Sequence, residues 1–409
     1  MERTDHWLNH KRLTVYPRMI LVTMLVLSIA WVRMSKSHVD HQGKPLGYDF
    51  ITFWAASHLA LVGHAPDAYN IPLIFQAEQI AVPALRAMFG WYYPPTFFLL
   101  IWPLALLPYF AAYWTFILST LTCYLLVFRR IIKGSMAIWC LAAFSGVWMN
   151  FFHGQNAFLT AALAAATILC LKHRPTLAGV FLGLLAIKPH LALLFPVALI
   201  AIGAWRTLFV AAVTATAFLG AGVAVLGTAT LKACLNSLGY ARVFLERGFL
   251  PWQKMPTVFA FLRLLRMPVA GAYALHALVA LGAAYTVWRV WRGSPDWQLR
   301  GASLMTATFL ISPYVFDYDL AWLAFPIAWL ALAGQRLGWL RGEREILVAA
   351  WLLPLFMAPL ANATHLQFGP FVLISLLWLT LRRAGATSGN TNPEIAVPGL
   401  ESVPEIAIA

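Results

Sequence analysis

The chain has 409 residues, of which 61% are apolar and only 11% are charged, whereas roughly a quarter of an ordinary soluble domain is charged. This composition excludes a soluble globule and supplies enough apolar residues for about a dozen membrane crossings of ~20 residues each. A net charge of +14 is typical of a membrane protein with Lys and Arg at its cytoplasmic ends, so no nucleic-acid partner is expected. Four cysteines are too few for disulfide bonds to stabilise a chain of this length, and we expect free thiols.

Twelve apolar segments predict an all-α polytopic membrane protein. In chain order they are residues 17–33, 109–128, 136–151, 157–171, 176–187, 190–204, 207–226, 270–288, 300–312, 319–333, 346–360 and 370–381. Several are shorter than the ~20 residues of a full crossing, so short or broken helices are expected. Residues 1–383 are predicted to form one membrane domain, whose first segment is a retained helix because it lacks a small-residue cleavage site. Residues 384–409 are rich in polar residues, Gly and Pro, which predicts a disordered cytoplasmic tail.

The basic residues predict the orientation. With the N-terminus in the cytoplasm, 18 of the 29 Lys and Arg residues fall on the cytoplasmic side, as the positive-inside rule requires. The short outer turns at 152–156, 313–318 and 361–369 contain neither Lys nor Arg. Both termini are then cytoplasmic, and two long loops, 34–95 and 228–268, lie outside. Mixed apolar and polar residues in 50–63 and 72–90 predict helices along the membrane interface.

Asp49 follows Tyr48 at the start of one of these interfacial segments. An ionisable group flush with an apolar segment is a functional candidate, because partial burial tunes its acid chemistry, and Tyr48 is expected to orient it by a hydrogen bond. The alternative is that Asp49 caps the helix that follows. The other acidic residues of the outer loops have polar neighbours and are expected to be solvated: Asp40, Asp67, Glu78 and Glu246.

A second acidic candidate is the turn ISPYVFDYDL at residues 311–320, which carries Asp317 and Asp319 with Tyr314 and Tyr318 beside them. Two carboxylates at this spacing bind a cation or order sugar hydroxyls, and a divalent cation is therefore left open. The alternative is that Asp319 caps the next helix.

Lys188 and His190 stand at the hinge between two short apolar segments. Helices of about 12 residues rise about 18 Å, less than the ~30 Å hydrocarbon core, so this hinge is expected near the outer leaflet. One interpretation is a contact of Lys188 with a lipid-borne phosphate. The other is that Lys188 snorkels to the headgroups.

Two further stretches are candidates for substrate contacts. The turn His153-Gly154-Gln155-Asn156 is rich in hydrogen-bonding groups, and Tyr93 belongs to the aromatic run WYYPP at the end of the first outer loop. The alternatives are that Gly154 and Asn156 are there because the tight turn requires such residues, and that the aromatic residues anchor the chain at the membrane interface. Sequence motifs for nucleotide binding, metalloprotease or serine-hydrolase chemistry are absent, and no metal-ligand set is predicted.

Taken together, an ordered set of motifs resembles glycosyltransferase family 87, long known as domain of unknown function 2029. The motifs are YDFITFWAAS, YYPPTFFLLIWPLALLP, GQNAFLTAALAAA, GLLAIKPHLALLFP and SPYVFDYDLAWL. The resemblance covers roughly residues 45 to 330. The family includes polyprenol-phosphate-mannose-dependent α-mannosyltransferases.

The resemblance implies a GT-C fold with its active site on the outer face of a bacterial inner membrane. It implies transfer of a sugar, expected to be mannose, from a polyprenyl-phosphate donor to a lipid or glycan acceptor with inversion. An Asp in the first outer loop is the base in such enzymes, and Asp49 matches that position. The mannosyltransferases carry a histidine in the outer turn where this chain has Asp317, Tyr318 and Asp319.

This chemistry needs no bound cofactor, because a sugar on a prenyl phosphate is already activated. The enzyme has only to take a proton from an acceptor hydroxyl and to stabilise the departing phosphate. In this scheme Lys188 and His190, with one of the arginines of the second outer loop, supply positive charge for the phosphate.

Two other functions remain open at this point. A transporter or flippase would also be polytopic but is expected to show matched halves, and no internal repeat of the motifs is found. A lipid-linked polysaccharide polymerase or ligase is the nearer alternative and is expected to concentrate arginines in one large late outer loop.

Overall fold

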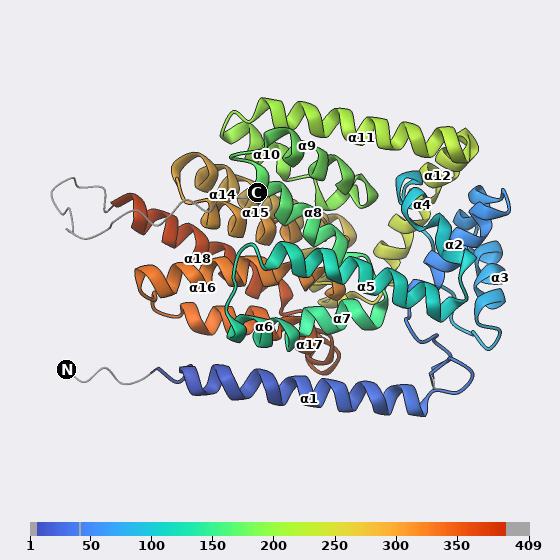
Figure 1. The fold of residues 1–409 in the computed structure, drawn as a ribbon, viewed down its shortest axis with the longest axis horizontal. Helices are drawn as coiled ribbons and strands as arrows, with labels where there is room; N and C mark the ends of the chain where they lie inside the picture. The colour runs from blue at the N-terminus through green and yellow to red at the C-terminus, as the bar shows by residue number, and fades with distance from the viewer. Residues whose placement is uncertain (1–5, 41, 390–409) are drawn as a thin grey trace.

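The computed structural model describes residues 6–40 and 42–389, and the fold of this part is helical (Figure 1). Each of the twelve predicted segments contains helix, although the segment 190–204 is helical only in part. The seven longest helices are α1 (His10–Met34), α5 (Tyr109–Phe128), α11 (Trp205–Leu226), α12 (Thr228–Arg247), α14 (Val269–Gly293), α17 (Glu343–Thr364) and α18 (Gly369–Gly389). All four cysteines are free thiols, as the sequence predicted.

Fewer helices than predicted are full membrane crossings by length and composition. Among the described residues six qualify, namely α1, α5, α11, α14, α17 and the segment Asp317–Leu337. That segment consists of η6 (Asp317–Leu323) and α16 (Ala324–Leu337). A seventh is obtained if α6 (Ser135–Ala142) and α7 (Ser145–His153), bent by 47°, count as one. By length and composition the twelve predicted crossings therefore reduce to six or seven; α18 is long enough but does not pass on composition, and the remaining segments are shorter.

The shorter helices fill the space between the long ones. They are α8 (Ala157–Cys170), α9 (Pro175–Leu184), η3 (Leu185–Ile187), η4 (Pro189–Leu191), α10 (Phe195–Ala201) and α15 (Trp297–Ile311). The break between η3 and η4 follows from Pro189, which lacks an N–H and disfavours a helical residue before it. Lys188 accordingly has φ −143° and ψ 68°. The hinge thus turns the Lys188 side chain out of both helices.

The two long loops predicted to lie outside, for which we keep the name outer loops, also fold into helices. The first contains α2 (Phe50–Leu61), η1 (Ala65–Tyr69) and α3 (Ile71–Ala81), and it leads into α4 (Pro95–Ile101) and η2 (Trp102–Leu106). The second contains α12, η5 (Trp252–Lys254) and α13 (Val258–Leu264). In Figure 1, α2, α3, α4 and α12 gather at the right-hand end, whereas the start of α1 and the end of α18 lie at the left-hand end. Both loops therefore occupy the end of the bundle opposite these helix ends.

The first outer loop differs from the sequence prediction in two respects. The segment predicted as an interfacial helix at 50–63 is a buried helix, since every residue from Phe50 to Ser57 is buried. The helix predicted at 72–90 ends at Ala81, just before Pro83 removes a backbone donor. The apolar segment Pro95–Leu106 was not among the twelve predicted ones.

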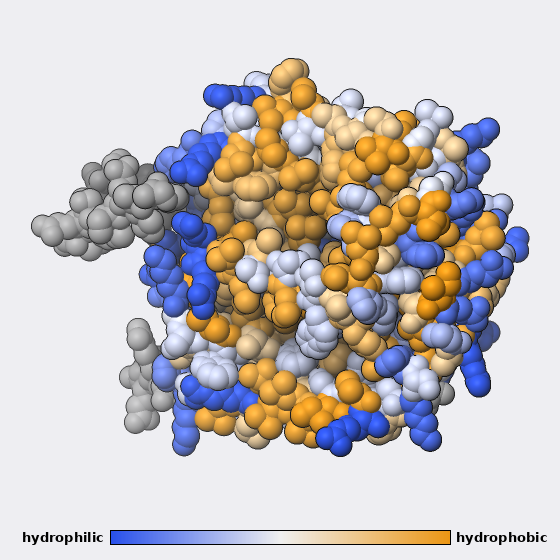
Figure 2. Space-filling view, turned by 45° about the vertical axis from the view of Figure 1, so that its right-hand side comes forward, coloured by the Kyte–Doolittle hydropathy of each residue, from blue (hydrophilic) through white to orange (hydrophobic). Residues whose placement is uncertain are grey.

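The outer surface supports a membrane-integral protein. Figure 2 shows apolar residues over the middle of one face and hydrophilic residues gathered toward two opposite ends. The long helices expose large apolar side chains, among them Val22 of α1, Phe209 of α11 and Leu281 of α14. Such a surface is unfavourable in water and stable against lipid.

A cavity of about 1460 Å³ lies between α1 and helices α6, α16 and α17. Its walls are mainly apolar, with Tyr16, Leu141 and Trp351 among the lining residues. None of the predicted site residues lines it. The predicted chemistry therefore belongs to a different part of the molecule.

The C-terminal boundary differs slightly from the prediction. Helix α18 continues to Gly389, six residues into the stretch predicted as a disordered tail from Ala384. Residues 390–409 of that predicted tail lie outside the described residues.

Glu78 of α3 was expected to be solvated, and this expectation is wrong. Its side chain is fully buried, with Oε2 accepting from the Phe89 N–H at 3.5 Å and Oε1 without a partner among the described residues. Burial raises the pKa of Glu78 to about 9. The folded protein thus keeps Glu78 protonated at neutral pH, whereas an unfolded chain ionises it near the ordinary value of about 4.3.

This shift predicts a pH dependence of stability. Between the unfolded and folded pKa values the folded state holds the extra proton, so Glu78 lowers stability progressively as the pH rises from about 4.5 to about 9. Glu78→Gln removes this effect while keeping an acceptor for Phe89. We expect the variant to melt at a higher temperature than the parent at pH 8.5, with the difference shrinking toward pH 5. Parallel melting curves across this range would contradict the assignment.

Candidate active site

Asp49 stands at the N-terminus of α2, but its side chain does not cap the helix. No backbone N–H of the first turn donates to its carboxylate. Instead Oδ2 accepts a hydrogen bond from Gln155 Nε2 at 3.0 Å. The side chain is half-buried. The carboxylate therefore keeps acceptor capacity that the capping alternative would have used.

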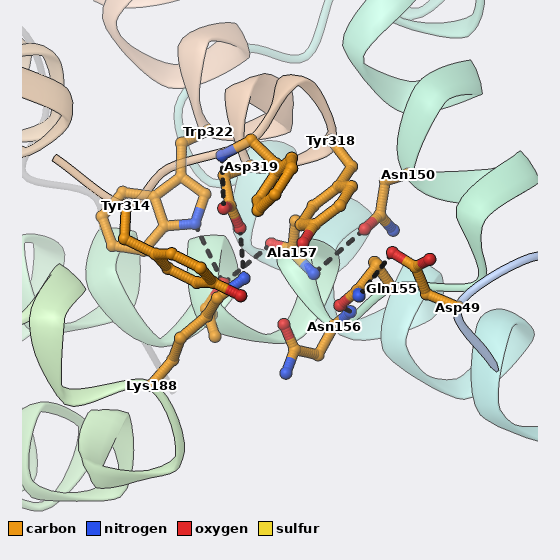
Figure 3. Close-up of polar contacts among 12 residues, drawn as sticks. Asp49, Asn150, Gln155, Asn156, Ala157, Lys188, Tyr314, Tyr318, Asp319 and Trp322 are labelled. Atoms are coloured by element: carbon orange, nitrogen blue, oxygen red, sulfur yellow. Dashed lines mark hydrogen bonds and ion pairs between the residues drawn. The ribbon is translucent and has the colours of Figure 1, made fainter. Parts of the chain in front are cut away.

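Gln155 is itself held in place by Tyr93. The Tyr93 hydroxyl donates to Gln155 Oε1 at 2.8 Å, which leaves the amide nitrogen to face Asp49. Tyr93 and Gln155 were predicted as substrate contacts. The structure joins them into a hydrogen-bonded chain that orients Asp49 (Figure 3 shows Gln155 beside Asp49).

Gly154 allows the turn that carries Gln155 to reach Asp49. Its φ is +59°, a left-handed conformation that favours glycine. A Cβ at this position would lie 2.4 Å from the Phe50 Cβ and 2.8 Å from the Gly47 carbonyl oxygen. A side chain here would push the turn away from the start of α2.

Gly154→Ala is therefore expected to impair both folding and catalysis. The left-handed backbone costs about 1–2 kcal/mol with a Cβ, and the contact with Gly47 and Phe50 adds to it. We expect a lower melting temperature and at least ~10-fold slower sugar transfer, because Gln155 is displaced from Asp49. Gly282→Ala in α14, where nothing lies within 4 Å of a new Cβ, is the control. Parent-like melting and turnover of Gly154→Ala would show that this close approach is unimportant.

Tyr48 was expected to orient Asp49, and this is wrong in its detail. Its hydroxyl donates to Asp40 Oδ2 at 3.0 Å, and Asp40 is nearly buried, not solvated as expected. Burial and the neighbouring Asp40 raise the pKa of Tyr48, which keeps the hydroxyl protonated as a donor. Its ring stacks on Trp31 of α1 at 5.7 Å and lies 5.4 Å from the His153 ring. Tyr48 thus ties α1 and the first outer loop to the turn at 153–156.

Lys188 and Asp319 form a buried ion pair. Lys188 Nζ lies 2.6 Å from Asp319 Oδ1, and the side chains are 4% and 1% exposed. The alternative that Lys188 snorkels to the headgroups does not match this contact, because the ammonium is buried against Asp319. The second Asp319 oxygen accepts from the Phe316 N–H at 3.3 Å. Asp319 therefore both caps η6 and neutralises Lys188.

Several buried polar groups at the site lack partners among the described residues. They are both side-chain polar atoms of Asn156, the Asn150 amide nitrogen, Asp317 Oδ2 and His190 Nε2. Asn156 precedes α8 without capping it through its side chain, so turn chemistry does not account for this residue. Figure 3 places Asn156 between Lys188 on one side and Asp49 on the other. Unpaired buried polar groups are costly, which favours a role in binding a polar ligand.

The remaining predicted contacts lie around this cluster. The Tyr314 ring packs edge-on against His190 at 5.8 Å, and Tyr318 lies 5.0 Å from the Lys188 ammonium. His153 lies 5.5 Å from the Tyr318 ring. The predicted site residues therefore form one connected cluster, which extends from Asp49 to Lys188.

Three residues of the site were missed by sequence reasoning. Asn150 lies one helical turn before His153, Asp40 holds Tyr48, and Lys254 Nζ lies 3.1 Å from His153 Nε2. Lys254 belongs to the basic second outer loop, from which only an arginine had been expected at the site. The positive charge of this loop indicated that one of its cations could reach the site. No feature of the neighbouring sequence distinguishes Lys254 from the other five.

Comparison with known proteins gives the family. The family model for glycosyltransferase family 87 matches residues 91–313, more than half of the chain. No curated protein and no solved structure matches the chain. The match covers the Tyr93, Gln155 and Lys188 positions of the candidate site. This chain belongs to glycosyltransferase family 87 and is a membrane glycosyltransferase.

Proposed function

We propose that the enzyme transfers a sugar from a polyprenyl-phosphate donor to a hydroxyl of a lipid or glycan acceptor, and that this sugar is mannose. The transfer inverts the anomeric carbon and takes place on a GT-C fold at the outer face of a bacterial inner membrane. The observation that carries the proposal is the half-buried Asp49 carboxylate, which is free of a capping role and oriented by Gln155.

The reaction balances with Asp49 as the general base. The acceptor hydroxyl oxygen forms a bond to the anomeric carbon and gives its proton to Asp49. The bond from the anomeric carbon to the phosphate oxygen breaks, and its electron pair leaves with the prenyl phosphate. A positioned base contributes typically 10²–10⁴-fold to such a step.

The other residues of the site have proposed roles in binding. Asn156 and Asp317 offer unpartnered polar atoms to sugar hydroxyls, whose hydrogen bonds would offset the cost of burying these groups. Tyr314 and His153 line the same region. Lys188 and His190 remain the predicted phosphate contacts of the hinge, although Lys188 shares its ammonium with Asp319.

The proposed orientation rests on two observations that agree. Asp49 belongs to the first outer loop, and this loop lies at the opposite end of the bundle from the start of α1 and the end of α18 (Figure 1). The positive-inside rule assigns these two helix ends to the cytoplasm. The site would then face the periplasm, where a lipid-linked donor is accessible.

Lipid analysis tests the proposal most directly. Cells lacking the protein are expected to lose a glycolipid or glycan intermediate, which overproduction restores. Purified protein in lipid nanodiscs should then consume a prenyl-phosphate mannose in the presence of the unglycosylated form of that acceptor. An unchanged lipid profile, together with no consumption of the donor, would contradict the proposed function.

A further inference from the structure

Lys254 is a cation at the site that makes no direct contact with a carboxylate of the described residues, although its charge acts on the Asp317 carboxyl over a longer distance. It ends η5 and is half-buried, and no carboxylate oxygen of residues 6–40 and 42–389 lies within 4.0 Å of its ammonium. Lys188, by contrast, is neutralised by Asp319 at 2.6 Å. Of these two lysines, Lys254 is therefore the one whose ammonium is not held by a carboxylate in direct contact.

His153 holds Lys254 in place. His153 Nδ1 lies 2.8 Å from the Met149 carbonyl oxygen, and since a carbonyl oxygen only accepts, Nδ1 carries the proton. Nε2 then presents its lone pair to the Lys254 ammonium at 3.1 Å. This contact uses one of the three N–H donors of Lys254, so two remain for a ligand.

Lys254 also lies beside Tyr48, the residue that precedes the proposed base. Its ammonium is 5.9 Å from the centre of the Tyr48 ring, and Tyr48 directly precedes Asp49. No ion pair joins Lys254 and Asp49 among the described residues, so this carboxylate and this cation do not neutralise each other by direct contact.

We propose that Lys254, positioned by His153, binds the phosphate of the donor and balances the charge of the leaving prenyl phosphate. This assignment rests on the proposed function, because it takes the donor to be a prenyl phosphate. The phosphodiester of the donor carries one negative charge, and the prenyl phosphate that departs acquires a second. A lysine ammonium, a compact point charge with several donors, suits a phosphate whose charge grows as the bond breaks.

Binding of the leaving group without sugar tests this assignment. Purified full-length protein in nanodiscs is titrated with a polyprenyl phosphate and, separately, with the uncharged polyprenol of the same length. Lys254→Met is expected to weaken polyprenyl phosphate binding by ~10- to 100-fold and to leave polyprenol binding unchanged. Lys254→Gln, a second neutral variant, should behave alike, whereas Lys254→Arg should retain most of the affinity.

Two further variants sharpen the comparison. Lys44→Met is the matched control, because Lys44 lies 5.6 Å from the same Tyr48 ring but does not contact His153; its affinity for polyprenyl phosphate is expected to stay at the parent level. His153→Phe keeps an aromatic ring and removes Nε2, and it should weaken binding of the phosphate but not of the polyprenol.

The outcomes separate the two proposals. A parent protein that binds polyprenyl phosphate no better than polyprenol would overturn the proposed donor class, and with it the role of Lys254. A parent that prefers the phosphate, with the same preference in folded Lys254→Met and Lys254→Gln, would overturn only the assignment to Lys254. Equal losses in Lys44→Met and Lys254→Met would also overturn it.

Discussion

Asp49→Asn is expected to lower the turnover of sugar transfer by at least ~10²-fold with little change in donor binding. The Asn side chain is nearly isosteric and still accepts the hydrogen bond from Gln155, so the site keeps its shape. It cannot take the proton of the acceptor hydroxyl. Because Asp49 makes no capping bond and is half-buried, its replacement should hardly change the melting temperature.

Asp67→Asn is a suitable control for this experiment. Asp67 lies in the same outer loop, is partly exposed and pairs with the exposed His64 at 3.1 Å. Turnover of this variant should equal that of the parent. If folded Asp49→Asn turned over within a few-fold of the parent, Asp49 would not be the base, and Asp317 would become the next candidate.

Lys188→Met is expected to cause the largest loss of stability. It leaves the Asp319 carboxylate buried without its ionic partner, and breaking a buried ion pair in this way typically costs about 3–5 kcal/mol. Both side chains are almost completely buried and 131 residues apart in the chain. The pair therefore joins the α9–α10 hinge to η6, and its loss should loosen both. Thermal unfolding of the purified protein measures the effect.

The double variant Lys188→Met, Asp319→Asn separates the charge from the packing. It removes both charges, while the amide oxygen of the new side chain still accepts from the Phe316 N–H, so most of the lost stability should return. The single variant Asp319→Asn leaves a buried ammonium and should be unstable as well. Additive losses in the double variant would mean that the two charges are not coupled and that the ion pair is not stabilising.

The positions of the helices were largely predictable from the sequence, whereas the number of helices that can cross a membrane was not. All twelve predicted segments contain helix because long apolar stretches can satisfy their backbone only as helices in a membrane. The segment lengths predicted short or broken helices, but they did not show which helices are buried. The separate stretch 50–63 is an example: its mixed pattern suggested an interfacial helix, but tertiary packing buries its first eight residues.

Candidate residues were also visible in the sequence, because polar groups flush with apolar segments are conspicuous. Asp49, Lys188, Gln155 and Asp319 were singled out in this way. Their partners were not predictable: Asp49 meets Gln155 106 residues away, and Tyr48 turns to Asp40 instead of Asp49. Lys254 had no local feature that separated it from the other cations of its loop.

The sequence by itself thus determined the class of protein, the helical segments and a set of candidate residues. These depend on composition and on short-range patterns, which the chain carries locally. The tertiary structure alone decided which carboxylate is neutralised, which remains available and which cation makes no direct contact with a carboxylate of the described residues. Those properties depend on contacts between residues a hundred or more positions apart, and such contacts arise only when the helices pack together.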